Sequence, residues 1–186
     1  KMTKLVSDLL TVARSDNQAL KVKLMKFDIS ALMEQTLRLM QPLADKKNIM
    51  LQGEGMAPVE VQADEQKIRQ LVLILVDNAV KYTPEGGRVT LRLETAEGGR
   101  VRFSVQDTGI GIAKEDQQRI FDRFFRVDKA RSRAMGGNGL GLAIAQEIVQ
   151  LHQGNITVKS EAGQGTAFTV EFKAKTENKK VSLKNE

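Results

Sequence analysis

The first hydrophobic pattern along the chain is helical. Through residues 1–17, apolar side chains recur three or four positions apart and form a broad stripe, with coiled-coil-like periodicity. The stripe consists of Met2, Leu5, Val6, Leu9, Leu10, Val12 and Ala13. We predict the end of a longer helix here, followed by a stop or linker at Ser15-Asp16-Asn17. Because an isolated helix of this length is marginally stable, we expect the chain to be mainly monomeric.

The next patterns alternate between strand and helix. Three short strands are predicted, at 20–27, 48–52 and 59–62. A glycine-containing turn separates the second strand from the third. Asp28 or Ser30 is a suitable N-cap for a helix that reaches about Lys46. A strongly apolar helix is predicted over 64–82, with inner-face residues Ile68, Leu71, Val72, Leu75 and Val76.

Four further strands and one helix are predicted in the second half of the chain. The strands span 88–94, 100–106, 155–160 and 166–173, and the helix spans 140–152. Their turns are rich in glycine, at Pro84-Glu85-Gly86-Gly87, Glu97-Gly98-Gly99 and Gly163-Gln164-Gly165. This mixture of strands and helices predicts an α/β two-layer sandwich, with helices covering one face of the sheet.

A long polar segment, 113–137, interrupts this pattern and is typical of a lid. It carries aromatic residues, then basic residues, then a glycine pair: Phe121, Phe124 and Phe125; Arg126, Lys129, Arg131 and Arg133; Gly136-Gly137. The phenylalanines could dock the lid or a neighbouring helix by burial, or they could be ordinary core residues. The sequence leaves both interpretations open.

The composition of the 186 residues is globular, with 41% hydrophobic and 28% charged residues. No apolar run reaches membrane-spanning length and no signal peptide is visible, while the start at Lys1 suggests a piece of a longer chain. Cysteine is absent, which excludes disulfides and thiolate metal sites. The net charge of +6 suggests a nucleic-acid binder, but half of it lies in 173–186 and aromatics make up only 4%. We therefore expect no nucleic-acid partner, and a flexible basic tail at 174–186.

Three glycine clusters are candidates for binding phosphate. They are Asp107-Thr108-Gly109-Ile110-Gly111, Gly136-Gly137-Asn138-Gly139-Leu140-Gly141 and Gly163-Gln164-Gly165-Thr166. The middle cluster runs into a predicted helix, whose free N–H groups and dipole favour an anion. Each cluster alone is equally compatible with an ordinary turn. The P-loop and dinucleotide-binding glycine motifs are absent, so any nucleotide is bound by another geometry.

Two further positions suit a magnesium nucleotide. Asn78, Lys81 and Tyr82 share one face of the predicted helix 64–82, where an amide can ligate Mg²⁺, an ammonium can meet phosphate and a ring can lie against a base. Asp107 ends an apolar strand, where its carboxylate can accept a hydrogen bond from an adenine amino group. The alternatives are a solvated helix end and a turn-initiating aspartate.

The order of these motifs resembles that of one family. DNAVKY, DTGIGI, FDRFFR, GGNGLGLAI and GQGT resemble the N box, F box and glycine boxes of sensor histidine kinases, within the family shared with gyrase, heat-shock-ninety chaperones and mismatch-repair ATPases. The resemblance implies an ATP-binding catalytic domain at 20–173, with a mixed sheet of about five strands, three helices on one face and a long ATP lid. Residues 1–17 resemble the end of the dimerisation and phosphotransfer helix.

The resemblance also implies a site. Asn78 would ligate Mg²⁺, Lys81 would contact phosphate, and these two would be the catalytic residues. Asp107 would read the adenine amino group. The implied ATP-binding set is Asn78, Lys81, Tyr82, Asp107, Gly109, Gly111, Ile112, Arg126, Gly137, Gly139, Leu140, Gly141, Leu142 and Thr166.

Two features depart from the family pattern. Many relatives have a second asparagine four residues before Asn78, where this chain has Ile74. ATP-hydrolysing relatives have a water-activating glutamate there, and isoleucine cannot act as a base, so we expect poor ATP hydrolysis. The phosphoacceptor motif, a histidine followed by an acidic residue and leucine, is also absent. The one histidine, His152, precedes Gln153 at a helix end, and we interpret it as structural.

The implied activity is transfer of the γ-phosphoryl group of ATP to a histidine on the dimerisation domain, for relay to a response regulator. The acceptor histidine would lie upstream of Lys1, in a protein that is a homodimer when complete. The implied location is cytoplasmic, with any membrane contact through parts outside this chain. Four alternatives stay open: a regulatory nucleotide-binding module, a gyrase-like or mismatch-repair-like ATPase, a serine kinase of an anti-sigma antagonist, and a basic binding module.

Overall fold

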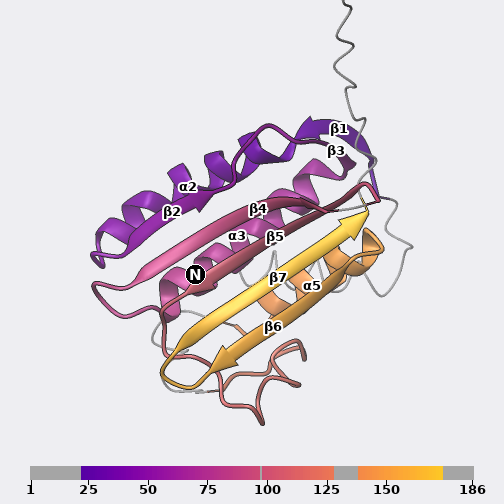
Figure 1. The fold of residues 1–186 in the computed structure, drawn as a ribbon. Helices are drawn as coiled ribbons and strands as arrows, with labels where there is room; N and C mark the ends of the chain where they lie inside the picture. Colours follow the sequence, from indigo (N-terminus) through magenta and orange to yellow (C-terminus); the bar gives the residue numbers. More distant parts are fainter. Residues whose placement is uncertain (1–21, 97, 128–137, 174–186) are drawn as a thin grey trace, which may run out of the picture.

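The computed structural model describes residues 22–96, 98–127 and 138–173, which form two sheets and a layer of helices. The strands are β1 (Met25–Asp28), β2 (Met50–Glu54), β3 (Glu60–Ala63), β4 (Arg88–Ala96), β5 (Arg100–Asp107), β6 (Asn155–Glu161) and β7 (Gly165–Lys173). The helices are α2 (Ile29–Asp45), α3 (Glu65–Tyr82) and α5 (Gly141–Leu151). The main sheet has the order β2-β4-β5-β7-β6, and β1 pairs with β3 in a small second sheet (Figure 1).

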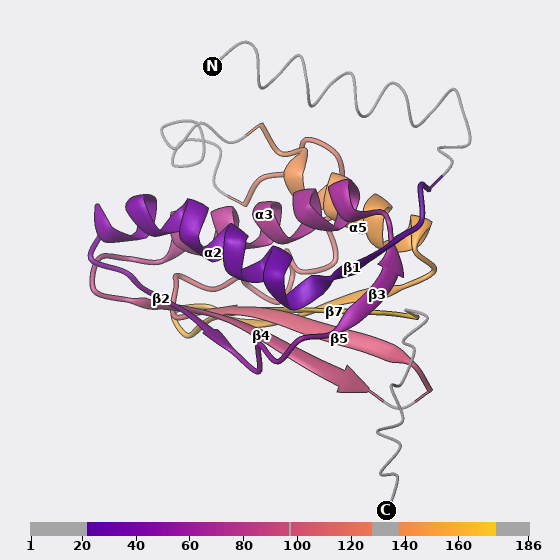
Figure 2. The ribbon, with the colours of Figure 1, turned by 90° about the horizontal axis from the view of Figure 1, so that it is seen from above.

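The main sheet is mixed. β2 runs parallel to β4, and the other neighbouring pairs are antiparallel. All three helices cover one face of this sheet, as Figure 2 shows. The predicted architecture, a two-layer α/β sandwich with about five strands and three helices on one face, is therefore confirmed.

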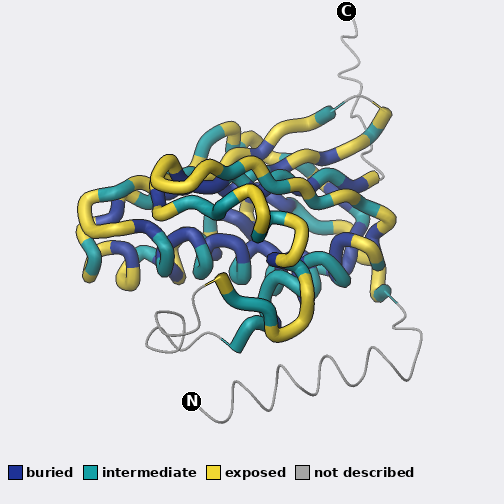
Figure 3. The backbone as a smooth tube through the Cα atoms, turned by 90° about the horizontal axis from the view of Figure 1, so that it is seen from below, coloured by how far each residue is buried: buried dark blue, intermediate teal, exposed yellow. Residues whose placement is uncertain are grey.

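The core lies between the sheet and the helices, where the buried positions gather in Figure 3. Along each central strand, every second side chain is buried, as expected for a sheet with one face towards helices. These inward residues are Val89, Leu91, Leu93, Val101, Phe103, Val105, Phe168, Val170 and Phe172. The inner face of α3, with Ile68, Leu71, Val72, Leu75 and Val76, is buried as predicted.

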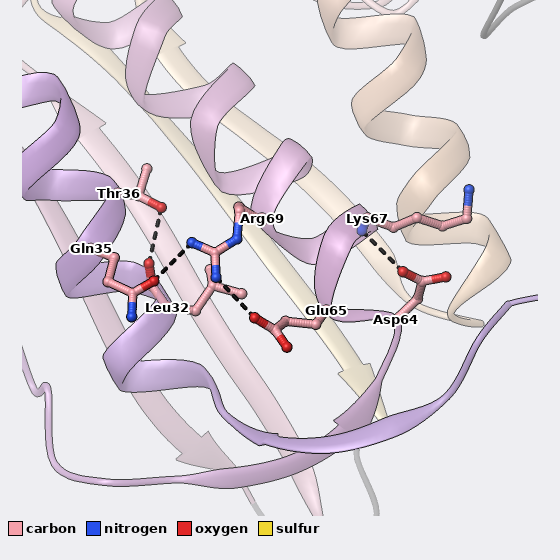
Figure 4. A network of polar contacts seen from close by, with 7 residues as sticks. All are labelled: Leu32, Gln35, Thr36, Asp64, Glu65, Lys67 and Arg69. Carbon is pink, nitrogen blue, oxygen red and sulfur yellow. Dashed lines mark hydrogen bonds and ion pairs between the residues drawn. The ribbon is translucent and has the colours of Figure 1, made fainter.

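Both long helices begin at an aspartate N-cap. Asp28 accepts a hydrogen bond from the backbone of Ser30, and Asp64 accepts one from the backbone of Lys67. Figure 4 shows how the helices join near these starts. Arg69 of α3 donates to Gln35 of α2 at 2.9 Å and to Glu65 of α3 at 2.9 Å.

The strand predicted at 20–27 is shorter than expected. Its described part begins at Met25, because its partner β3 has only four residues and the pairing ends at Met25 opposite Ala63. The strands flanking Gly55 join different sheets, because β3 pairs with β1 and β2 pairs with β4. The predicted helix 1–17 and tail 174–186 lie outside the described residues, as do Lys129, Arg131, Arg133, Gly136 and Gly137. No helix in the described ranges has the length and apolarity to span a membrane.

Candidate functional site

The predicted site residues come from four separate segments that meet beside the end of α3. The backbone N–H of Ile110 donates to the carbonyl of Tyr82 at 3.2 Å, which joins the loop after β5 to α3. The start of β7 reaches the end of β5 through Thr166 and Asp107. At the start of α5, a Cβ on Gly141 would lie 3.4 Å from Cγ2 of Ile74. The structure thus brings the end of α3, the 107–112 loop, the start of α5 and the β6–β7 turn into one region.

Asp107 is a buried carboxylate at the end of β5, with a relative exposure of 6%. Its Oδ1 accepts hydrogen bonds from the backbone N–H groups of Gly109 at 2.8 Å and Thr166 at 3.2 Å. Burial raises the pKa of Asp107 above 3.8, and these two hydrogen bonds act in the opposite direction. Among the described residues, none donates a hydrogen bond to Oδ2. One oxygen of a fixed carboxylate is therefore left for a ligand donor.

The loop that follows Asp107 is held in shape by glycine and by Ser160. Gly111 has φ of +66°, and a Cβ there would lie 1.9 Å from the carbonyl oxygen of Glu161. The Ser160 hydroxyl accepts the backbone N–H of Ile112 at 2.8 Å, and it donates to the carbonyl of Gly165 at 2.8 Å. The same hydroxyl lies 2.9 Å from the Thr166 hydroxyl. Ser160 therefore fastens the loop to the β6–β7 turn.

Ser160 and Gln117, which contact each other, were not predicted from the sequence. Gln117 Nε2 donates to the carbonyls of Ile112 at 2.9 Å and Ser160 at 2.8 Å. The alternation along β6 could have indicated Ser160, because it lies on the same inward face of the strand as Ile156 and Val158. A hydroxyl in an inward row needs a partner, and here the partners are backbone groups of the site.

The end of α3 carries the predicted polar trio. Asn78 is half-buried, and its side chain forms no hydrogen bond with a described residue. Lys81 is not free, because its ammonium forms an ion pair with Asp77 one helical turn earlier. This ion pair follows the four-residue helical spacing, and it was not anticipated from the sequence. An incoming phosphate would therefore share Lys81 with Asp77.

The start of α5 leaves backbone N–H groups open. Its N-cap is Leu140, which is buried and supplies no side-chain cap. Asn138 Oδ1 accepts the N–H of Leu140 at 3.3 Å, before the first helical turn. The first-turn N–H groups of Gly141 and Leu142 have no acceptor within the helix, which makes this end suitable for an anion. Gly139 has φ of +73°, and a Cβ there would lie 2.8 Å from the backbone of Phe124.

Arg126 follows the aromatic residues of the polar segment. Its Nε and Nη2 atoms are buried, and neither has a hydrogen-bond partner among the described residues. Phe121 packs edge-on against Phe168 at 6.3 Å between ring centroids, whereas Phe124 is 58% exposed. Arg119 lies over the ring of Phe125 at 4.4 Å. Phe121 and Phe125 therefore pack against the core, as in the second interpretation, whereas Phe124 is not buried. The docking of the lid stays a prediction.

His152 is structural, as interpreted from the sequence. Its Nδ1 lies 2.8 Å from the carbonyl of Ile148, and its Nε2 accepts the N–H of Asp64 at 3.1 Å. Nδ1 thus holds the ring to α5, and Nε2 joins the end of α5 to the start of α3. Across the described ranges, no cluster of three or more histidine, cysteine, aspartate or glutamate residues could hold a metal. Asn78 is the residue predicted from the sequence to ligate Mg²⁺ here.

The described residues fit a nucleoside triphosphate. The unpaired nitrogens of Arg126 are unfavourable when buried unless an anion joins them. The open N–H groups at the start of α5 also favour a negatively charged group, and the carboxylate of Asp107 favours an N–H donor. Gly137, another predicted phosphate contact, lies outside the described residues.

Comparisons with known proteins show the family to which the chain belongs. The family model described as histidine kinase-, DNA gyrase B-, and HSP90-like ATPase matches residues 63–176. The chain is 38% identical over 181 residues to the sensor histidine kinase WalK of Bacillus subtilis, covering 96% of this chain and 30% of WalK. It thus spans about a third of that relative's length.

Solved structures share the fold. Full-length ShkA in complex with AMPPNP matches with a TM-score of 0.84 at 37% identity, over 95% of this chain and 36% of ShkA. The catalytic domain of histidine kinase ThkA, in a nucleotide-free form, matches with a TM-score of 0.71 at 29% identity, over 81% of this chain and 95% of that domain. The chain therefore belongs to the histidine kinase-, DNA gyrase B- and HSP90-like ATPase family, and it is a catalytic ATP-binding domain of the sensor histidine kinase type.

Proposed function

We propose that this chain binds Mg²⁺-ATP and transfers the γ-phosphoryl group to a histidine on the dimerisation domain of its own kinase. The observation that carries the proposal is Asp107, a buried carboxylate with one oxygen fixed by Gly109 and Thr166 and the other free of described donors. Such a group can accept the amino N–H of adenine. It therefore selects the base, while the α5 end and Arg126 attract the phosphates.

In the proposed reaction, an imidazole nitrogen of the acceptor histidine forms a bond to the γ-phosphorus. The bond from that phosphorus to the bridging oxygen breaks, and ADP leaves. Phosphoryl transfer depends mainly on positioning and charge neutralisation. Lys81, Arg126 and the open N–H groups of α5 would neutralise phosphate charge. Asn78 would hold Mg²⁺, which supplies further neutralisation when bound.

The proposed partners follow from this activity. The acceptor domain belongs to the same kinase, which would be a homodimer when complete, and a response regulator would receive the phosphoryl group next. The location proposed for this domain is the cytoplasm. No general base stands at Ile74, so we propose slow ATP hydrolysis compared with the gyrase-like members of the family.

A second candidate is a regulatory nucleotide-binding module without transfer activity. The observation that favours it is the packing of Ile74 beside Gly141, where many relatives have a polar metal or phosphate contact. Phosphotransfer decides between the two candidates.

The test combines binding with transfer. Calorimetry with a non-hydrolysable ATP analogue, with Mg²⁺ and then with EDTA, is run on the parent chain, on Asp107→Asn and on Asp45→Asn, a matched change at an exposed position of α2. We expect binding that Mg²⁺ strengthens, and that only Asp107→Asn weakens, by about 10- to 100-fold. Labelled phosphate should then appear on an added acceptor domain. Binding without transfer would support the regulatory module, and a folded parent that binds no analogue would refute both candidates.

A further inference from the structure

Lys47 lies in the turn between α2 and β2, outside every motif singled out in the sequence. Its ammonium donates to three backbone carbonyls at the end of α3. The Nζ–O distances are 2.7 Å to Val80, 3.0 Å to Lys81 and 2.7 Å to Thr83. One side chain thus holds together the turn that carries the polar trio of the site.

The hydrogen bonds at this helix end form a complete set. The last carbonyls of a helix lack partners within the helix, so they need other donors. The N–H and hydroxyl of Thr83 both donate to the carbonyl of Ala79, and the N–H of Ile110 donates to that of Tyr82. Lys47 supplies the carbonyls of Val80, Lys81 and Thr83. The 107–112 loop thus contacts the turn through Ile110, and Lys47 contacts it through three further carbonyls.

The charge of Lys47 strengthens this arrangement. A cation is favourable at the negative end of a helix dipole. Within the described residues, Lys47 has no carboxylate partner, so its three contacts are all with carbonyls. Burial lowers the pKa of Lys47, as expected for an ammonium partly removed from water. Val80 and Thr83 are buried as well, so their carbonyls have little access to replacement water.

Neighbours of Lys47 hold the same turn. Asn48 donates to Glu85 at 2.6 Å, and the N–H of Met50 donates to the carbonyl of Gly87 at 2.9 Å. Residues 47–50 therefore run along the segment that leads from α3 into β4. At the end of this segment, the N–H of Arg88 donates to the hydroxyl of Thr108, in the 107–112 loop.

We propose that Lys47 is a positioning residue for nucleotide binding, because it holds the last turn of α3 at the distance from the 107–112 loop that the site requires. The inference rests on the proposed function, since it assigns a role within that site. Asn78, Lys81 and Tyr82 all lie on or next to this turn, so a small displacement would move the metal, phosphate and base contacts together.

The test compares the two ends of α3. Lys47→Met removes the three hydrogen bonds at the end of the helix, and His152→Gln disturbs the contact at its start, far from the predicted site residues. Affinity for a non-hydrolysable ATP analogue is measured by calorimetry with Mg²⁺, below the melting temperature of each variant. We expect Lys47→Met to weaken binding about tenfold or more. We expect His152→Gln to lower the melting temperature while leaving the affinity within about twofold of the parent. Lys47→Arg, which retains the charge and several donors, should restore part of the lost affinity.

Each outcome bears on the proposal. Unchanged affinity in folded Lys47→Met would overturn it, and so would an equal loss in His152→Gln, because general stability would then explain both. If Lys47→Met does not fold, Lys47→Gln takes its place. Its amide keeps two N–H donors, so the expected loss of affinity is smaller, about fivefold or more. A parent chain that binds no analogue would refute the proposed function itself, whereas a binding parent with an equally tight Lys47→Met refutes the Lys47 inference alone.

Discussion

The backbone N–H of Thr166 donates to Oδ1 of Asp107 across 59 residues of sequence, at 3.2 Å. The two residues are also register partners in the pairing of β5 with β7. The carboxylate is therefore set by the central strands of the sheet, with the loop adding the second donor from Gly109. Its orientation therefore depends on the pairing of β5 with β7.

Replacing Asp107 by asparagine should separate binding from stability. An amide oxygen can still accept the N–H groups of Gly109 and Thr166, and a neutral group is easier to bury than a carboxylate. We expect the free energy of unfolding to stay within about 1 kcal/mol of the parent, while affinity for an ATP analogue falls about 10- to 100-fold through loss of a charge-assisted hydrogen bond. Urea unfolding and calorimetry measure the two quantities. A large loss of stability would contradict this account.

The pKa of Asp107 also predicts opposite pH effects on stability and binding. Because burial raises the pKa in the folded state above 3.8, the native protein takes up this proton before the unfolded chain does as the pH falls. The Asp107 contribution to stability should therefore increase on acidification between the raised pKa and 3.8, while nucleotide affinity decreases. The difference between parent and Asp107→Asn unfolding curves across this pH range isolates the effect. A difference that is independent of pH would count against it.

Two glycines with similar backbone angles should respond differently to alanine. Gly111 and Gly163 have φ of +66° and +80°, but a Cβ would lie 1.9 Å from an oxygen at Gly111 and would meet nothing within 4 Å at Gly163. Gly163→Ala should lower the free energy of unfolding by about 1–2 kcal/mol, because alanine disfavours the left-handed backbone conformation. Gly111→Ala should lower the free energy of unfolding by about twice that amount or more, and it should also weaken nucleotide binding. Thermal unfolding of both variants provides the comparison, and equal losses would show that the contact with Glu161 is unimportant.

Ser160→Ala should weaken the site from outside the predicted set. The variant leaves the N–H of Ile112 and the carbonyl of Gly165 without the hydroxyl that joins them. We expect a loss of about 1–3 kcal/mol in unfolding free energy and a measurable loss of nucleotide affinity. Ser104→Ala is the matched control, because Ser104 lies on β5 and its hydroxyl forms no hydrogen bond with a described residue. Similar effects in both variants would contradict the assigned role.

Asp28 should contribute stability that is lost in acid. Burial acts to raise its pKa, but hydrogen bonds from Ser30 and from backbone N–H groups together outweigh burial and lower the pKa below 3.8. Its contribution is therefore present above pH 3.8 and disappears as the pH falls through the lowered value. Asp28→Ala should lose about 1–2 kcal/mol near neutral pH and less in strong acid. Chemical unfolding at several pH values tests this, with Asp28→Asn as the variant that retains capping.

Much of the fold was predictable because its signals are local. The helical spacing of apolar residues predicted α3, and apolar segments bounded by glycine-rich turns predicted β4, β5 and β7. The partners of β2 and β3 were not predictable in this way. Strand pairing joins segments far apart in sequence, and a short alternating pattern does not specify its neighbour.

The candidate site likewise contains residues with local sequence signals and residues whose role depends on contacts between distant segments. Asp107 was predictable because it ends an apolar strand and precedes a glycine turn. Lys47 gave no such signal, because a lysine after a helix is ordinary in sequence and acquires meaning only when three carbonyls of another helix meet it. The ion pair between Asp77 and Lys81 follows helical spacing, but spacing alone does not show that the pair forms.

The position of β7 in the sheet has a consequence for how the site comes into being on the ribosome. β7 is the last strand of the described residues, yet it lies between β5 and β6 and supplies the Thr166 contact to Asp107. A nascent chain that has released α3, β5 and α5 still lacks the Thr166 donor to Oδ1 of Asp107. On the proposed role of Asp107, we expect a chain whose synthesis has not reached β7 to bind nucleotide poorly.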